Sequence, residues 1–214
     1  MKARFYPVVL SLACGLAACA SLPAAEPAPL PFSFVDPDDQ AVAEIRRLGQ
    51  RTIDQAGQAL VVEVRRVLAD NTAALAIGKL HLKDYKLPPV APGKPRVTEL
   101  RRTSLRVRNP ANAPDAADRA ALDRIQAQLE QGAAVDNLLM LRVTLPGVAP
   151  EWRVYRPVGT LKSCLDCHGR PGDLAPGVME TLQVFFPADK AVDYRNGEWR
   201  GVFRVSIADP AEKP

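Results

Sequence analysis

The sequence predicts an α+β fold, with helices early in the chain and a mostly antiparallel sheet after them. In the first half, apolar residues recur at steps of three and four, as they do on one face of a helix. The second half is rich in β-branched and aromatic segments that are separated by turn residues. The chain has 214 residues, 47% of them hydrophobic, which is enough for one domain with a substantial core.

A long amphipathic helix is expected over residues 39–69, with Asp38 or Asp39 as its N-cap. Its apolar face would consist of Val42, Ile45, Leu48, Ala56, Leu60, Val64 and Val67. A short second helix is expected over residues 72–82, because a proline-rich stretch follows it. A third is expected over residues 115–132, with a glycine at its end.

Five segments alternate polar and apolar residues or are rich in β-formers, and we expect them to be strands: residues 96–107, 137–145, 151–158, 178–186 and 198–207. Pro146-Gly147 would join the second and third strands as a hairpin. Asn196-Gly197 would form a turn between a short helix and the last strand.

Residues 1–19 have the features of a secretory signal. Lys2 and Arg4 begin it, and the apolar run from Phe5 to Ala18 is too short for a membrane-spanning helix. We therefore expect the protein to leave the cytoplasm. Without Lys2 and Arg4 the net charge of +4 comes close to neutral, which argues against a nucleic-acid partner.

The end of this signal, Leu16-Ala17-Ala18-Cys19, resembles the bacterial lipobox. The resemblance implies that Cys19 is acylated, and that the anchored protein is sorted to the outer membrane because Ala20 follows. Ordinary cleavage near Ala20, which would give a soluble periplasmic protein, is the alternative. Residues 20–38 are rich in proline and alanine and would form an extended tether to a domain over residues 39–210.

The segment Cys164-Leu165-Asp166-Cys167-His168, which we expect in the loop after the strand over residues 151–158, has the spacing of c-type haem attachment. Two thiols separated by two residues can reach the two vinyl groups of one porphyrin, and the next residue is then held beside the iron. A covalently held cofactor also suits a protein that matures outside the cytoplasm. The motif predicts one covalent haem c, bonded to Cys164 and Cys167, with His168 as an iron ligand.

Three other uses of the cysteine pair are weaker. A structural zinc site needs two more thiol or imidazole ligands, and beyond the signal the chain offers only His81 besides His168. A thioredoxin-like pair would start a helix after a buried strand, whereas Gly169-Arg170-Pro171-Gly172 indicates a loop. A disulfide suits an oxidising compartment, but a two-residue gap is short for a structural crosslink.

His81 is the only histidine besides His168 and is a candidate for the second axial ligand of the iron. Leucine and isoleucine residues of its predicted helix could form a wall of the haem pocket. Met179, a lysine or water are alternatives, and Met140 is more simply a core residue. A core or surface role for His81, without a bond to iron, is also open.

The chain resembles a family of single-haem c-type proteins with a PAS-like domain, long classed as a domain of unknown function. The resemblance covers most of the chain beyond the signal and rests on motifs in the family's order: Arg102-Thr103-Ser104, Arg108-Asn109-Pro110-Ala111-Asn112, Tyr155-Arg156-Pro157, Cys164 to Gly169, Phe186-Pro187-Ala188-Asp189 and Gly197-Glu198-Trp199-Arg200-Gly201. It implies a PAS- or GAF-like antiparallel sheet with N-terminal helices packed on it, and a haem against the sheet.

One departure from the family pattern concerns the sixth ligand of the iron. The family helix reads Ala-Ile-x-x-Cys and supplies a cysteine to the iron, whereas Ala76-Ile77-Gly78-Lys79-Leu80 has leucine in that place. His81 is the next residue. Either this imidazole replaces the thiolate or the iron has five ligands.

Arg106, Arg108 and Asn109 are candidates to bind the haem propionates, because guanidinium groups pair well with carboxylates. Alternatively, Arg108-Asn109-Pro110 is simply a turn with an asparagine cap.

The resemblance implies a redox or small-gas sensing module in the periplasm, which would pass its signal to a separate protein. An electron-transfer cytochrome in a periplasmic redox chain is the alternative. A peroxidase-like enzyme would need an open iron site with a distal acid-base residue, and it would lose both if His81 binds the iron.

Overall fold

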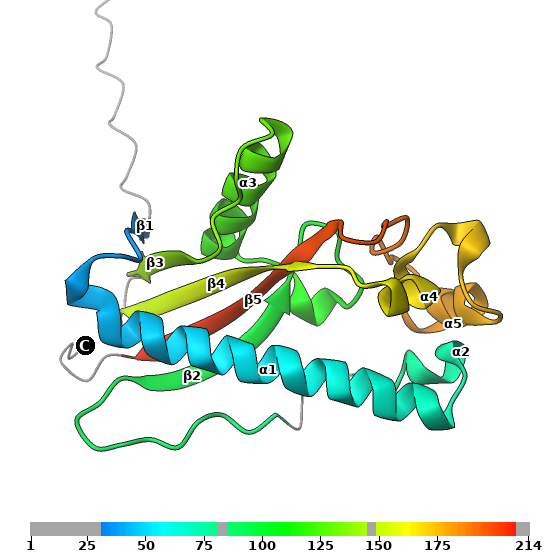
Figure 1. Cartoon of the computed structure of the whole chain (residues 1–214), viewed down its shortest axis with the longest axis horizontal. Helices are drawn as coiled ribbons and strands as arrows, with labels where there is room; N and C mark the ends of the chain where they lie inside the picture. The colour runs from blue at the N-terminus through cyan, green and yellow to red at the C-terminus, as the bar shows by residue number, and fades with distance from the viewer. Residues whose placement is uncertain (1–30, 81–84, 145–148, 209–214) are drawn as a thin grey trace, which may run out of the picture.

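The computed structural model describes residues 31–80, 85–144 and 149–208, and these residues form a five-stranded sheet with helices on both faces (Figure 1). The strands are β1 (Phe32–Val35), β2 (Arg96–Thr103), β3 (Leu139–Val143), β4 (Glu151–Gly159) and β5 (Trp199–Ala208). Their order across the sheet is β1-β3-β4-β5-β2, and every neighbouring pair is antiparallel. The α+β class and the PAS/GAF-like arrangement of sheet and helices are therefore confirmed.

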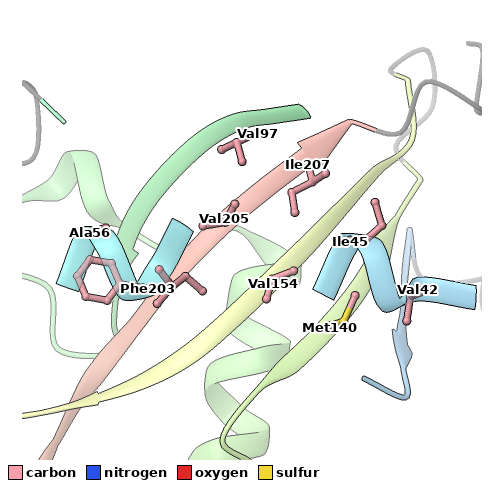
Figure 2. Close-up of a cluster of buried hydrophobic side chains, with 10 residues drawn as sticks. Val42, Ile45, Ala56, Val97, Met140, Val154, Phe203, Val205 and Ile207 are labelled. Carbon is pink, nitrogen blue, oxygen red and sulfur yellow. The ribbon is translucent and has the colours of Figure 1, made fainter. Parts of the chain in front are cut away.

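Helix α1 (Ala43–Asp70) crosses one face of the sheet. A 3-10 turn leads into it, and the carboxylate of Asp39 caps that turn by accepting a 2.9 Å hydrogen bond from the backbone N–H of Ala41. The helix packs closely, since a Cβ on Gly49 would lie only 2.6 Å from Cγ2 of Val154. Figure 2 shows the core between helix and sheet, which contains Val42, Ile45, Ile53, Ala56, Val97, Met140, Val154, Phe203, Val205 and Ile207.

Helix α3 (Ala116–Glu130) packs on the opposite face. Side chains alternate along a strand, so that Leu139 and Leu141 meet α3 whereas Met140 between them meets α1. This second core contains Ala117, Ala121, Leu122, Ile125, Leu139, Leu141, Val143, Tyr155 and Val202. Met140 is fully buried, as expected for a core residue.

Three short helices gather at one end of the molecule (Figure 1): α2 (Ala73–Ala76), α4 (Leu165–His168) and α5 (Val178–Phe185). Their own small core contains Ile77, Val178 and Leu182, and Cys167 packs against it. Within the described ranges, no helix is both long enough and apolar enough to cross a membrane.

The prediction of a strand over residues 178–186 is wrong, because this segment is helix α5. The two apolar residues that it buries, Val178 and Leu182, are four positions apart, which is helical spacing. The segment is mostly apolar but does not alternate, so its composition indicated a strand while its spacing favours a helix. Val184 and Phe185 are left exposed.

Two further predictions need correction. The CxxCH segment, expected in a loop, forms a 3-10 turn (Lys162–Cys164) followed directly by α4. The short helix expected before Asn196-Gly197 is absent, since residues 187–198 contain turns, a bend and irregular backbone but no helix. The turn at Asn196-Gly197 itself is confirmed, with Gly197 at a φ of 82°.

Some predicted elements have different lengths from those expected. The first strand ends at Thr103 and not at residue 107, and the second helix is reduced to α2, followed by a turn in which Lys79 and Leu80 bond to the carbonyl of Ala76. Strand β1 was not predicted, because it lies in the proline-rich segment; it pairs with β3.

Candidate functional site

The CxxCH segment follows the end of β4 and is tied to the loop that precedes β5. The backbone N–H of Thr160 donates to the carbonyl of Glu198 at 2.9 Å, and the N–H of Gly197 donates back to Thr160 at 2.8 Å. Gly169 closes α4, because its N–H bonds to the carbonyl of Leu165 and a Cβ there would lie 2.6 Å from that oxygen. Backbone hydrogen bonds therefore hold the CxxCH segment in place just before it begins, at Thr160, and where it ends, at Gly169.

Both cysteines of the segment are half-buried, and neither is in a disulfide. The Cys164 sulfur accepts a 3.4 Å hydrogen bond from the N–H of Leu161. The Cys167 sulfur lies 3.9 Å from the carbonyl oxygen of Ala73 in α2, and burial raises the pKa of this thiol. The predicted disulfide alternative finds no support in this geometry.

His168 has one ring nitrogen engaged by the protein. Its Nδ1 lies 2.6 Å from the carbonyl oxygen of Ala191. A carbonyl oxygen can only accept, so Nδ1 carries the proton and Nε2 carries the lone pair. Burial lowers the pKa of His168 to about 3, and the charges of Arg108 and Arg200 act in the same direction. The imidazole is therefore neutral at physiological pH.

Arg108 joins the CxxCH segment to the loop that holds Ala191. Its guanidinium donates to the carbonyl of Cys167 at 2.6 Å and to that of Ala191 at 3.2 Å. It also pairs with Asp189 at 3.0 Å, and the other oxygen of Asp189 accepts from the N–H of Ala191 at 2.7 Å. Two more backbone bonds, from Asp193 to Gly169 and from Tyr194 to His168, complete the attachment.

Arg106 and Arg200 lie on Tyr194, whose ring meets the His168 ring edge to face at a centroid distance of 6.3 Å. The guanidinium carbons of Arg106 and Arg200 are 4.0 Å and 5.2 Å from the centre of the Tyr194 ring. Arg106 also pairs with Glu198 at 3.4 Å and donates to the carbonyls of Lys190 and Val192.

The structure thus brings Arg106 and Arg108 together with Cys164, Cys167 and His168, but Asn109 has a local role. Its side chain accepts a 3.0 Å hydrogen bond from the N–H of Ala111 and caps the 3-10 turn Pro110–Asn112. Whether these three residues bind propionates stays a prediction.

Sequence reasoning did not single out Tyr194, Asp189 or Ala191 as parts of the site. Arg102 and Arg200, which act on His168 through their charges, were also missed. Arg102, Arg200 and Asp189 do stand inside the motifs that carry the family resemblance, and that was the available signal.

Two predicted site residues, His81 and Cys19, lie outside the described residues. Leu80 is the last described residue before His81, and α2 is attached to α4 through the contact of Ala73 with Cys167. Over the ranges that the structure covers, no three His, Cys, Asp or Glu side chains come together as a metal site would require.

The model of a protein family described as Tll0287-like matches residues 44–208. Among solved structures, the crystal structure of the cyanobacterial haem protein Tll0287 is similar, with a TM-score of 0.40 and 19% sequence identity. The alignment covers 82% of this chain and 96% of that one. No curated protein sequence matches the chain.

Proposed function

The chain belongs to the Tll0287-like family, and from this membership and its CxxCH geometry we propose that it is an exported single-haem c-type cytochrome. Its role would be that of a periplasmic redox or small-gas sensing module. Tll0287, whose name the family carries, is a cyanobacterial haem protein. The family match covers the CxxCH segment and all the arginines around it.

The observation that carries the proposal is the hydrogen bond between His168 and Ala191. Histidines that bind metals usually donate their other ring N–H to a carbonyl or carboxylate, which fixes the tautomer and the ring orientation. Here the bond to Ala191 leaves Nε2 of His168 with a free lone pair. The lowered pKa keeps the ring neutral, as a metal ligand must be.

The two thiols also fit covalent haem attachment. Cys164 and Cys167 lie on one continuous helical segment, both half-buried and neither bonded to another sulfur. Reduced thiols beside an imidazole are what the attachment of a porphyrin through two thioether bonds requires. When bound, the haem would supply one-electron chemistry and an axial position for a second ligand.

For that second position we propose His81, next in sequence to Leu80. The contact between Ala73 of α2 and the sulfur of Cys167 supports this choice, because it attaches the helix that precedes His81 to the haem-binding segment. In a sensor, carbon monoxide or nitric oxide would then compete with the imidazole of His81 for the iron.

Electron transfer is the second candidate function. The exposed positions around the motif support it: Leu161 is 54% exposed, and Lys162 and Ser163 beside it are exposed too. A haem bonded to this segment would have an edge near the surface, where a redox partner protein could approach it.

Export and membrane attachment are proposals that rest on residues 1–30, which lie outside the described ranges. Residues 1–19 would direct export, and acylation of Cys19 would anchor the protein to the outer membrane. The tether expected over residues 20–38 is shorter, because β1 (Phe32–Val35) belongs to the sheet of the haem domain. Periplasmic localisation follows from the same segment.

Visible spectra of the full chain, matured in a host with cytochrome c assembly machinery, test the proposed function. A sensor gives a ferrous spectrum that changes when carbon monoxide or nitric oxide is added. In His81→Ala the same gas binds at lower concentration, because no imidazole competes. A ferrous spectrum unaffected by either gas contradicts sensing and favours electron transfer, and a colourless protein contradicts both roles.

A further inference from the structure

Four arginines lie around the CxxCH segment, and they differ in how their charges are balanced. Arg106 pairs with Glu198, and Arg108 pairs with Asp189 in an environment where the two side chains are only 13% and 7% exposed. Neither Arg102 nor Arg200 forms an ion pair with a carboxylate of the described residues. These two cationic groups thus lack a direct salt bridge in the described structure, although Tyr194 and Asp189 also act on Arg200.

Arg200 is held at this place by the local bend of β5. Gly201 has a φ of 151°, and a Cβ at this position would lie 2.4 Å from the carbonyl oxygen of Thr103. This close approach of β5 to β2 needs a glycine, and it places the Arg200 guanidinium 2.8 Å from the hydroxyl of Ser104 and 3.1 Å from the carbonyl of Arg106. Arg200 is therefore positioned before any ligand arrives.

Arg102 reaches the same site from the neighbouring strand. It pairs in register with Phe203, and its half-buried guanidinium makes no hydrogen bond within the described part of the chain. Its charge is repelled by that of Arg200. Both arginines also act on His168, so their charges lie close to the ring that would bind the iron.

The surroundings of these two side chains favour an anion. Burial lowers the pKa of Arg102 to about 10, with the repulsion from Arg200 as the next cause. Burial also lowers the pKa of Arg200, and the repulsion from Arg108 adds to it, while Tyr194 and Asp189 act in the opposite direction without reversing the shift. Positive charges that lie close together and are partly shielded from water raise the free energy of the site unless a negatively charged group binds there. A carboxylate is the natural partner, because its two oxygens match the guanidinium fork.

We propose that Arg102 and Arg200 bind the two propionate groups of the haem, one guanidinium for each carboxylate. This inference rests on the proposed function, since it needs a haem on the CxxCH segment. It assigns the propionate edge of the porphyrin to the junction of β2 and β5. Arg106 and Arg108, the propionate candidates from the sequence, are already paired with Glu198 and Asp189. In this proposal they keep the loop around Ala191 in place instead.

The test compares the haem reduction potential, as a function of pH, in four matured full-length proteins: wild type, Arg102→Gln, Arg200→Gln and Arg195→Gln. Arg195 is the matched control. It is an exposed arginine of the loop that contains Ala191, and its side chain makes no hydrogen bond or ion pair in the described structure. Covalent haem content is measured in parallel from the pyridine haemochrome spectrum.

We expect Arg102→Gln and Arg200→Gln to retain covalent haem but to be harder to reduce. The ferrous haem carries one negative charge more than the ferric form, so loss of a nearby cation disfavours it. The redox equilibrium constant should fall at least tenfold, which is about 59 mV for one electron. The potential should also become more dependent on pH, because a propionate without its arginine takes up a proton at higher pH. Arg195→Gln should match wild type.

A purely structural role would give another pattern, in which stability falls but the potential and its pH profile stay as in wild type. That result, with haem attached, overturns the inference while leaving the proposed function intact. Arg200→Lys separates charge from shape, because it should recover part of the potential lost in Arg200→Gln if a carboxylate is bound there. Absence of haem from the wild-type protein would instead be a failure of the proposed function.

Discussion

The imidazole Nδ1 of His168 lies 2.6 Å from the carbonyl oxygen of Ala191, on the loop between α5 and β5. The position of this carbonyl depends on Asp189, whose carboxylate accepts from the N–H of Ala191 and pairs with Arg108. Arg108 in turn donates to the carbonyls of Ala191 and Cys167. One ion pair thus supports both the CxxCH segment and the acceptor of its histidine.

Replacement of Asp189 by alanine should weaken the fold and alter the iron site together. It leaves the largely buried Arg108 without its partner, and breaking a buried ion pair costs about 3–5 kcal/mol. We expect the free energy of unfolding, measured with urea, to fall by an amount near the lower end of this range. The haem spectrum should also change, because the Ala191 carbonyl is no longer held against His168.

Asp173→Ala is the control for that variant, because Asp173 is exposed and should shift stability by less than about 0.5 kcal/mol. Equal stabilities for Asp189→Ala and Asp173→Ala would show that the ion pair does not hold the loop.

A buried charge network beneath α3 should support stability without affecting the haem. Asp118 is fully buried and accepts from Tyr155 at 3.0 Å and from Arg153 at 3.2 Å, with Arg204 3.7 Å away. Asp118→Ala removes one carboxylate of the network and the acceptor of the buried Tyr155 hydroxyl, while Arg153 keeps Asp115 and Glu151 and Arg204 keeps Glu99. We expect a loss of about 1–3 kcal/mol in the free energy of unfolding. Asp123→Ala, an exposed change on the same helix, should be close to neutral.

The haem reduction potential of Asp118→Ala, measured where the variant is folded, should equal that of wild type, because none of the partners of Asp118 belongs to the candidate site. A shifted potential would mean that the two regions are coupled.

Stability should fall in acid partly through Asp115. Burial by itself raises the pKa of Asp115, but hydrogen bonds from the backbone of Asp118 and from Arg153 bring it below its ordinary value of 3.8. A carboxyl whose pKa is lower when folded stabilises the fold fully above its unfolded pKa. This stabilisation is lost as the pH falls from about 4 towards the folded pKa.

Urea unfolding at pH 7 and pH 3 tests whether stability falls in acid because Asp115 takes up a proton. Wild type should lose more stability over that interval than Asp115→Asn, which can still cap α3 but does not titrate. The same loss in both proteins would exclude Asp115 as a source of acid sensitivity.

Replacement of two glycines of α1 by alanine should change the stability of the protein in opposite directions. At Gly49 the new Cβ would lie 2.6 Å from Cγ2 of Val154, so Gly49→Ala forces helix and sheet apart and should cost about 1–3 kcal/mol. At Gly57 the nearest atom would be Cε2 of Phe203 at 3.9 Å, so Gly57→Ala should stabilise by about 0.5–1 kcal/mol through helix propensity. Thermal unfolding of the pair gives the comparison, and a stabilised Gly49→Ala would contradict the close packing of α1.

Regular elements with a clear period could be predicted from the sequence, and those whose pattern is ambiguous could not. The spacing of Val42, Ile45 and Ala56 predicted α1, because one helical face meets the sheet. Residues 178–186 were assigned wrongly, since a short apolar segment suits a strand as well as a helix. Strand β1 was missed, because its pairing with β3 is a long-range contact that local composition does not reveal.

The motif residues of the site could be predicted because they, too, form a local pattern in the sequence. Cys164, Cys167 and His168 follow one another at a spacing that has a chemical meaning. Asp189 pairs with Arg108, and the carbonyl of Ala191 lies against His168, both far away in the chain. Arg200 is placed by the close approach of the backbone at Gly201. Such roles depend on the tertiary structure, so the motifs that contain Asp189 and Arg200 mark these residues without revealing what they contact.

The mass of the peptide that contains Cys164 and Cys167 is the most direct test of the proposed haem attachment. We expect this peptide, isolated from the full chain after maturation by a cytochrome c assembly system, to carry one haem joined by two thioether bonds. In Cys164→Ala and Cys167→Ala one of the two bonds should be lost, with a matching shift in the pyridine haemochrome spectrum. A wild-type peptide with two free thiols or a disulfide, and no added porphyrin, would contradict the assignment.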